Sequence, residues 1–261
     1  MLKKAVIGLI AILLISFAGC NDDEVGSGDI IADVAVYNGI GSWDVSVTAV
    51  CAAIRWAGFT VDTLSVDRIF SDDLYRYRAV LFPGGDTHEV LNALGLSGNA
   101  RIRAFVGDGG AFIGLGGGSA IADSGEGIWE GIRLFNGWAQ YPLEAIAVPP
   151  GYAITNIELV GTLHPIGLEG ASHYQTLYHG GPQFSFSMDE PIDVIFDYVA
   201  TDRPAAIACT YRSGRIFLAG FQPEIEENSD RDSTDFGADL LDPDSEWEII
   251  RRAVGYCLWE L

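Results

Sequence analysis

The chain has 261 residues, of which 36 are Asp or Glu and 15 are Lys or Arg, so its formal charge at pH 7 is −21. A chain this acidic is repelled by phosphate backbones, and we therefore expect no nucleic-acid partner. Hydrophobic residues make up 49% of the sequence, and the residues from 32 to 261 suit one large domain with its own core.

Residues 1–19 have the pattern of a secretory signal: Lys3 and Lys4, a short apolar run, and small residues before Cys20. The apolar run is shorter than the roughly 20 residues that span a bilayer. The end of this segment, FAGC, resembles the bacterial lipobox, whose Cys receives a lipid. An ordinary cleaved signal or an uncleaved anchor are the alternatives. Residues 20–31 are then a lipidated Cys and a flexible tether.

A lipid on Cys20 predicts a protein anchored to a membrane of the cell envelope and facing the periplasm or the exterior. Removal of the signal also removes Lys3 and Lys4, the only lysines of the chain. The mature protein is therefore still more acidic, and anionic headgroups would repel it. We expect only the lipid to hold it at the membrane.

The predicted elements then alternate in the way that is typical of a parallel sheet. A buried strand at 32–37 is followed by a glycine-rich turn and by a helix that Ser42 can cap. That helix carries an apolar stripe and ends at Gly58. Further strands are predicted at 59–64, 79–82 and 111–113, with a helical region around 102–106.

The second half predicts three more strands, at 192–198, 205–211 and 216–219. A last helix follows, which Asp242 can cap and whose buried face includes Trp247 and Val254. The sequence does not say whether residues 129–191 form a subdomain. Three cysteines besides Cys20 have no regular spacing, and we interpret them as buried small hydrophobic residues, with one disulfide as the alternative.

A glycine-rich stretch at 114–118, GLGGG, follows the strand at 111–113. In hydrolase-like α/β folds such a strand-to-helix turn carries a nucleophile at its centre. Here the central position is Gly116, which has no side chain. Ser119 lies three residues further on; it is a weak candidate nucleophile, and capping of a helix is its more common use.

Several motifs in order resemble the biotin-protein ligase N-terminal domain family, which belongs to the class I glutamine amidotransferase-like superfamily. They are YNG at 37–39, FPGGD at 82–86, IRAFV at 102–106, GGAFIG at 109–114 and YHGGPQF at 178–184. The resemblance spans about residues 32–224. It implies a flavodoxin-like, doubly wound, mostly parallel α/β sheet flanked by helices, and it does not imply biotin ligation.

Enzymes of that superfamily pair an elbow Cys with a His in a G-x-H-P-E segment. The matching positions here are Gly116 and Gln222, and Glu224 keeps the acidic position. A glutamine cannot accept a proton at neutral pH, so it cannot serve as the general base. The resemblance therefore predicts a degenerate site in a pseudoenzyme, with Glu224 as a structural or ligand-facing carboxylate.

The carboxyl ends of parallel strands are where such folds bind ligands. The positions that we expect to line a pocket for a small polar or anionic ligand are Asn38, Gly84, Gly85, Asp86, Gly116, Gly117 and His179. Asp86 is interpreted first as a helix cap. His179 is a loop histidine bonded to the backbone in one interpretation and a substitute base in the other.

Ten acidic residues and one base, Arg231, lie between 224 and 246, and we expect a solvated acidic loop there. No cofactor and no metal are expected. The leading hypothesis is a lipid-anchored binding protein for a small ligand or an envelope partner. The alternative is a hydrolase or amidase that uses Ser119 or a water with His179 as its base.

Overall fold

The computed structural model describes residues 29–125, 131–167, 172–227, 229–242 and 245–260. The predicted signal, Cys20 and most of the predicted tether lie outside these residues. The strands are β1 (Ala32–Tyr37), β2 (Val61–Leu64), β3 (Tyr77–Phe82), β4 (Ala111–Leu115), β5 (Gly137–Gln140), β6 (Ala153–Leu159), β7 (His173–Tyr178), β8 (Gln183–Phe186), β9 (Asp193–Tyr198), β10 (Arg203–Tyr211) and β11 (Gly214–Ala219).

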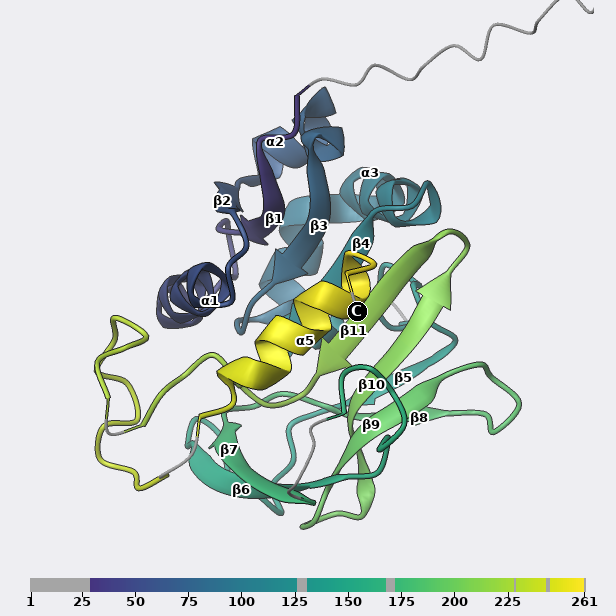
Figure 1. The fold of residues 1–261 in the computed structure, drawn as a ribbon. Helices are drawn as coiled ribbons and strands as arrows, with labels where there is room; N and C mark the ends of the chain where they lie inside the picture. Colours follow the sequence, from purple (N-terminus) through teal and green to yellow (C-terminus); the bar gives the residue numbers. More distant parts are fainter. Residues whose placement is uncertain (1–28, 126–130, 168–171, 228, 243–244, 261) are drawn as a thin grey trace, which may run out of the picture.

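The helices are α1 (Asp44–Trp56), α2 (Val66–Phe70), the 3₁₀ helix η1 (Asp72–Arg76), α3 (Thr87–Gly107), α4 (Gly117–Ala120) and α5 (Trp247–Cys257). In the described part of the chain they flank a nine-stranded sheet of order β2-β1-β3-β4-β11-β10-β9-β6-β7 (Figure 1). The predicted α/β class is confirmed.

The half of the sheet that begins with β2 is parallel, as predicted: β2, β1, β3, β4 and β11 all run the same way. From β11 onward each strand pairs antiparallel with its neighbour, through β10, β9, β6 and β7. The whole sheet is therefore mixed. The parallel strands end on the same edge, which places their following loops together.

Alternate residues of the parallel strands face two separate cores, because successive side chains of a strand point to opposite faces. Val34 and Val36 of β1 pack in the core that α1 and α5 cover. Ala35 and Tyr37 pack in the core that α3 covers. Burial on both faces explains why these strands are almost continuously apolar and could be predicted from the sequence.

Residues 131–191 do not form a separate domain where the structure describes them. Strands β6 and β7 extend the main sheet at its antiparallel edge. Strands β5 and β8 pair with each other as a small ribbon, which lies beside β9 and β10 in Figure 1. The antiparallel half is thus an extension of one sheet.

Two predicted helix caps are wrong. The Ser42 hydroxyl donates to the Gly39 carbonyl at 2.7 Å, and α1 begins after Trp43 without a side-chain cap. Asp242 is buried and lies ahead of Glu246, the N-cap of α5. At Ser42, the Gly39 carbonyl competes for the side chain that the sequence assigns to the helix end.

Other local predictions are confirmed. Cys51, Cys209 and Cys257 are buried and free of disulfides. The apolar faces of α1 and α5, with Val50 and Val254 at their centres, are buried. None of the helices in the described ranges has both the length and the apolar character needed to cross a membrane.

Candidate functional site: a filled elbow beside an open cavity

The strand-turn-helix context of the elbow is present, as the sequence predicts. β4 ends at Leu115, Gly116 has φ 51° and ψ −130°, and α4 begins at Gly117. This φ lies in the left-handed region, which side chains of L-residues rarely adopt, so glycine relieves the strain at this turn. A Cβ on Gly117 would collide with the carbonyl oxygen of Gly85, so the two glycine-rich loops are in contact.

The space beside Gly116 is occupied by the side chain of Gln222. A Cβ on Gly116 would collide with the Nε2 atom of Gln222. The Gln222 amide is fully buried and held at both ends by His179: its Oε1 accepts from the His179 N–H at 2.8 Å, and its Nε2 donates to the His179 carbonyl at 3.0 Å. The amide thus pairs with the N–H and the carbonyl of His179, as a neighbouring strand would. A nucleophilic side chain at position 116 would have to displace this amide.

The remaining elements of the predicted catalytic set are also buried. Ser119 has no exposed surface, and its hydroxyl donates to the Gly116 carbonyl at 2.6 Å. The predicted capping role of Ser119 is therefore wrong: Gly116 is the N-cap of α4, no side chain caps that helix, and Ser119 lies within it. The hydroxyl has no path to solvent in this arrangement.

Glu224 lies next to the elbow and is fully buried. It accepts a hydrogen bond from the Ser46 hydroxyl, which in turn accepts from the Gly84 N–H at 2.9 Å. Burial raises the pKa of Glu224 to about 7, and the bond from Ser46 opposes that rise. The carboxyl thus ties α1 to the Gly84 loop, and of its two predicted roles the structural one matches this geometry.

A cavity of about 460 Å³ opens beside the filled elbow. Of the predicted pocket residues, Gly85, Asp86 and His179 line it. Asn38, Gly84, Gly116 and Gly117 do not: Asn38 is exposed elsewhere, and the three glycines are buried behind the lining.

Sequence reasoning did not place several other lining residues at this cavity, namely Gly41, Ser42, Trp43, Glu89, Ala147, Pro149, Pro150, Gly151 and Gly180. The Pro-Pro-Gly string at 149–151 predicts a turn. Nothing in the sequence places that turn opposite the loops after β1 and β3. The long connection between β5 and β6 carries it there.

The His179 ring sits among aromatic side chains. Its centroid lies 4.9 Å from Trp43, 5.5 Å from Phe236 and 6.1 Å from Tyr152. Burial lowers the pKa of His179, and a hydrogen bond to the Pro150 backbone partly offsets the effect. The imidazole is therefore neutral at pH 7. His179 makes the backbone hydrogen bonds expected of a loop histidine. The residue also lines the cavity.

The charge of the lining is negative. Asp86 caps α3, as predicted, by accepting from the N–H groups of His88 at 2.9 Å and Glu89 at 3.0 Å. Asp86 and Glu89 are exposed at the cavity, and no Lys or Arg is among its lining residues. The field at the cavity mouth therefore favours a neutral or cationic ligand over an anionic one.

A larger cavity of about 550 Å³ lies elsewhere, near the end of β10, and includes Arg133, Glu190 and Tyr211. It contains none of the residues that the resemblance singled out. The amide of Asn136 donates to Glu190 at 2.6 Å there. We therefore place the candidate site at the smaller cavity, which adjoins the elbow.

The parallel five-stranded core, the strand-turn-helix at Gly116 and the loops gathered beside it define a class I glutamine amidotransferase-like fold. Residues 32–124 match the family described as "Biotin-protein ligase, N terminal", which confirms the resemblance over that part of the chain. Among curated proteins, none matches the chain significantly.

Solved structures agree with this class. PurLQS from Thermotoga maritima is 16% identical, with a TM-score of 0.56, over 85% of this chain and 97% of that one. A putative ThuA-like protein from Bacteroides uniformis is 10% identical, with a TM-score of 0.57, over 86% and 90%. A β-galactosidase from Bacillus circulans is 15% identical, with a TM-score of 0.54; the match covers 88% of this chain and only 31% of the enzyme. At these identities the likeness concerns the fold alone.

Proposed function

We propose that this chain is a lipid-anchored, extracytoplasmic binding protein whose amidotransferase-like domain no longer performs amidotransfer. One observation carries the proposal: the Gln222 amide fills the space where a nucleophile at position 116 would stand. The same amide is fixed by two hydrogen bonds to His179. Acyl transfer through a thiol needs both a nucleophile and a base at these places.

The ligand that fits the cavity is small, polar, and neutral or cationic. A volume of about 460 Å³ is within the ordinary range for small-molecule sites. Trp43 and the neutral His179 ring offer apolar and stacking contacts, and the carboxylates of Asp86 and Glu89 offer acceptors. The two carboxylates would repel an anion. Of the polar or anionic ligand that the sequence predicts, only the polar alternative is therefore kept.

A thermal-unfolding screen tests this proposal. The protein is titrated with amino acids, amines, sugars and other metabolites, and each hit is repeated on Glu89→Trp, which places a large ring at the exposed mouth of the cavity. Ala100→Trp, an exposed position further along α3 and outside the cavity, is the matched control. A ligand of this cavity raises the melting temperature of wild type and control but not of Glu89→Trp. A hit that survives in Glu89→Trp binds elsewhere.

A hydrolase or amidase is the second candidate, and one observation favours it. His179 lines the cavity with a lowered pKa, so its ring can accept a proton at neutral pH. The buried, hydrogen-bonded Ser119 is a poor nucleophile for this reaction, and a bound water is the better one. This function predicts turnover that His179→Gln abolishes while the melting temperature stays within a few degrees.

The anchor at Cys20 is proposed from the sequence pattern alone. It is tested by expressing the wild type and Cys20→Ser with labelled fatty acid. Labelled wild type in the membrane fraction, together with unlabelled Cys20→Ser, supports the anchor. Wild type without label contradicts it.

If no small molecule shifts unfolding, an envelope protein that co-purifies with the anchored chain is the remaining partner.

A further inference from the structure

Several acids of the segment after β11 are buried, contrary to the expectation of a solvated loop, although others such as Asp235 are exposed. Glu227 is 5% exposed, Asp242 is 3% exposed and Glu246 is 2% exposed. Glu226 and Asp232 are buried as well. Because an ionised carboxylate is rarely buried without a compensating charge, this burial needs an explanation.

Three of these carboxylates converge on one point. One oxygen each from Glu227, Asp242 and Glu246 lies within 4.8 Å of the other two. Oxygens bound to a calcium ion lie about 2.3–2.6 Å from it, so opposite ligands are separated by up to about 5 Å. The spacing of the three oxygens is thus that of ligands on one side of a calcium shell.

Glu227 supplies the second, independent observation. Neither of its carboxylate oxygens has a hydrogen-bond partner among the described residues, although the side chain is 95% buried and one oxygen belongs to the convergent set. Leaving a buried acceptor unsatisfied is costly, and more so for a charged one. Asp242 and Glu246 make further contacts, so the argument rests on Glu227.

The one base of this acidic segment is engaged with groups outside the set of three carboxylates. Arg231 is the single base between residues 224 and 246. Its guanidinium pairs with Glu226 at 3.1 Å and donates to Ser245 at 2.8 Å. The same group lies 3.8 Å from the ring centroid of Trp247. Arg231 is therefore engaged with other partners.

We propose that Glu227, Asp242 and Glu246 bind one Ca²⁺ ion. All three donors are hard carboxylate oxygens, which suit Ca²⁺ and do not suit the softer transition metals. A divalent ion offsets most of the charge of three carboxylates and gives the orphaned oxygens of Glu227 a partner. The proposal departs from our sequence-based expectation of no metal. These ligands come from two separated stretches of chain.

The ion would also support His179, a lining residue of the candidate cavity, through a short chain of contacts. A Cβ on Gly237 would lie 3.5 Å from the Cγ of Glu227, so residue 237 packs directly on the metal ligand. The preceding residue, Phe236, stacks on His179. The ion would therefore fix the segment that carries Phe236 and join it to the start of α5.

The test uses the full chain, purified in mild detergent and stripped with a chelator. Calcium binding is measured by isothermal titration and by thermal unfolding at pH 7.5. We expect one ion per chain, and at about a hundred times its dissociation constant a rise in melting temperature of roughly 5–10 °C. Mg²⁺ at the same concentration should give less than half that rise; an equal rise would contradict the assignment to calcium.

Glu227→Gln and Glu246→Gln are expected to weaken calcium binding at least tenfold. The matched control is Asp235→Asn, which removes the same charge from an exposed position of the same segment and should bind like the wild type. Without calcium, Glu227→Gln should be at least as stable as the wild type, because it removes a buried repulsion; this separates a lost site from a lost fold. The proposal fails if the wild type binds no calcium, or if Asp235→Asn loses as much affinity as Glu227→Gln.

Discussion

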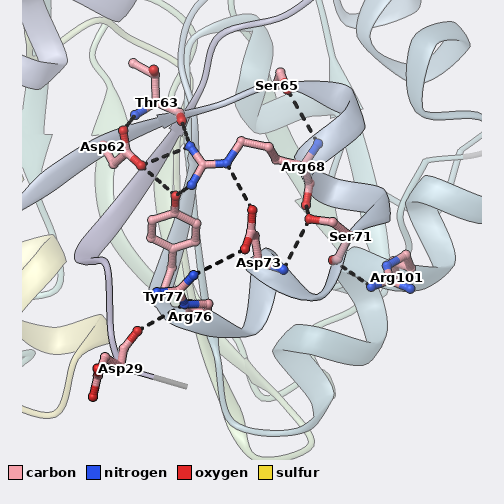
Figure 2. Close-up of polar contacts among 10 residues, drawn as sticks. All are labelled: Asp29, Asp62, Thr63, Ser65, Arg68, Ser71, Asp73, Arg76, Tyr77 and Arg101. Atoms are coloured by element: carbon pink, nitrogen blue, oxygen red, sulfur yellow. Dashed lines mark hydrogen bonds and ion pairs between the residues drawn. The ribbon is translucent and has the colours of Figure 1, made fainter. Parts of the chain in front are cut away.

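Two acid-rich regions of this protein differ in how far neighbouring groups compensate their negative charge. Around Arg68, between β2 and β3, the acids Asp62 and Asp73 each have a cation partner (Figure 2). Arg68 pairs with Asp62 at 3.0 Å and lies 3.6 Å from Asp73, and the Tyr77 hydroxyl donates to Asp62 at 2.7 Å. In the segment 224–246 the acids outnumber Arg231 ten to one.

Because of this difference, the carboxyl pKa values of the two regions shift in opposite directions. Burial raises the pKa of Asp62, but hydrogen bonds from Tyr77 and Arg68 outweigh it, and the net pKa is lowered. Burial raises the pKa of Glu226 as well, and there the bond from Ser245 and the charge of Arg231 do not reverse the rise. The partners of the first region therefore favour the ionised acid, whereas burial in the second region favours the neutral acid.

The largest expected effect concerns Glu224, because its folded-state pKa of about 7 lies above its ordinary value of 4.5. The folded state then holds a proton that the unfolded state has lost, so stability falls as the pH rises from about 4.5 to about 7. A shift of this size corresponds to about 3 kcal/mol. Urea unfolding of the calcium-free protein at pH 5 and pH 8 should show the loss, and Glu224→Gln should flatten it by about that amount. Parallel pH profiles for the two proteins would contradict this.

Arg231→Met should lower the free energy of unfolding by about 2 kcal/mol at pH 8, because it leaves Glu226 buried without its ion pair. The loss should be smaller at pH 5 than at pH 8, because the pKa of Glu226 is raised and a lower pH shifts this carboxyl toward the neutral acid. Chemical denaturation at the two pH values measures both. An equal loss at pH 5 and pH 8 would assign the effect to packing of the arginine stem on Trp247 rather than to charge.

Arg68→Met should cost about 1–2 kcal/mol at pH 7, less than a fully buried pair because both side chains are about one-third exposed. The pKa of Asp62 is lowered, so its contribution is present above the ordinary value of 3.8 and disappears as the pH falls through the folded-state pKa. The gap between wild type and variant should therefore close below pH 3.8, the opposite direction from Glu224. If the difference in unfolding free energy between wild type and Arg68→Met grew as the pH fell, the contrast between Asp62 and Glu224 would be contradicted.

The smallest effect is expected at Arg76, which belongs to the same network as Arg68. Its side chain is 42% exposed and lies 3.5 Å from Asp73. An exposed pair of this kind contributes about 0.5 kcal/mol or less. Arg76→Met should therefore unfold within that margin of the wild type. A loss as large as that of Arg68→Met would mean that the network acts as a unit.

The parallel strands could be predicted from the sequence because their burial on both faces demands uninterrupted apolar residues. Residues 32–37 are the clearest case. Strands β6 and β7 could not, since residues such as Asn156, Glu158 and Gln175 break the apolar pattern. These strands form at the antiparallel edge of the sheet, where neighbours decide what is buried.

The candidate site likewise has features that the sequence predicts and features that depend on distant contacts. The elbow context at Gly116 and the cap at Asp86 are local, and the sequence predicted both. The position of Gln222 within the elbow depends on a contact between residues more than a hundred positions apart. The cavity itself depends on a Pro-Pro-Gly turn whose placement no local pattern encodes.

The sequence by itself determined the α/β class, the family resemblance, and the absence of Cys and His from positions 116 and 222, because these follow from local periodicity and residue identity. Only the tertiary structure decided that Gln222 fills the elbow, that His179 faces a cavity, and that several acids of the segment 224–246 are buried. It also decided that neither carboxylate oxygen of Glu227 has a hydrogen-bond partner among the described residues. The physical reason is that the environment of a charge or an amide is set by which distant segments pack around it. The identity of a residue determines only the free-energy cost of burying its polar group without a partner.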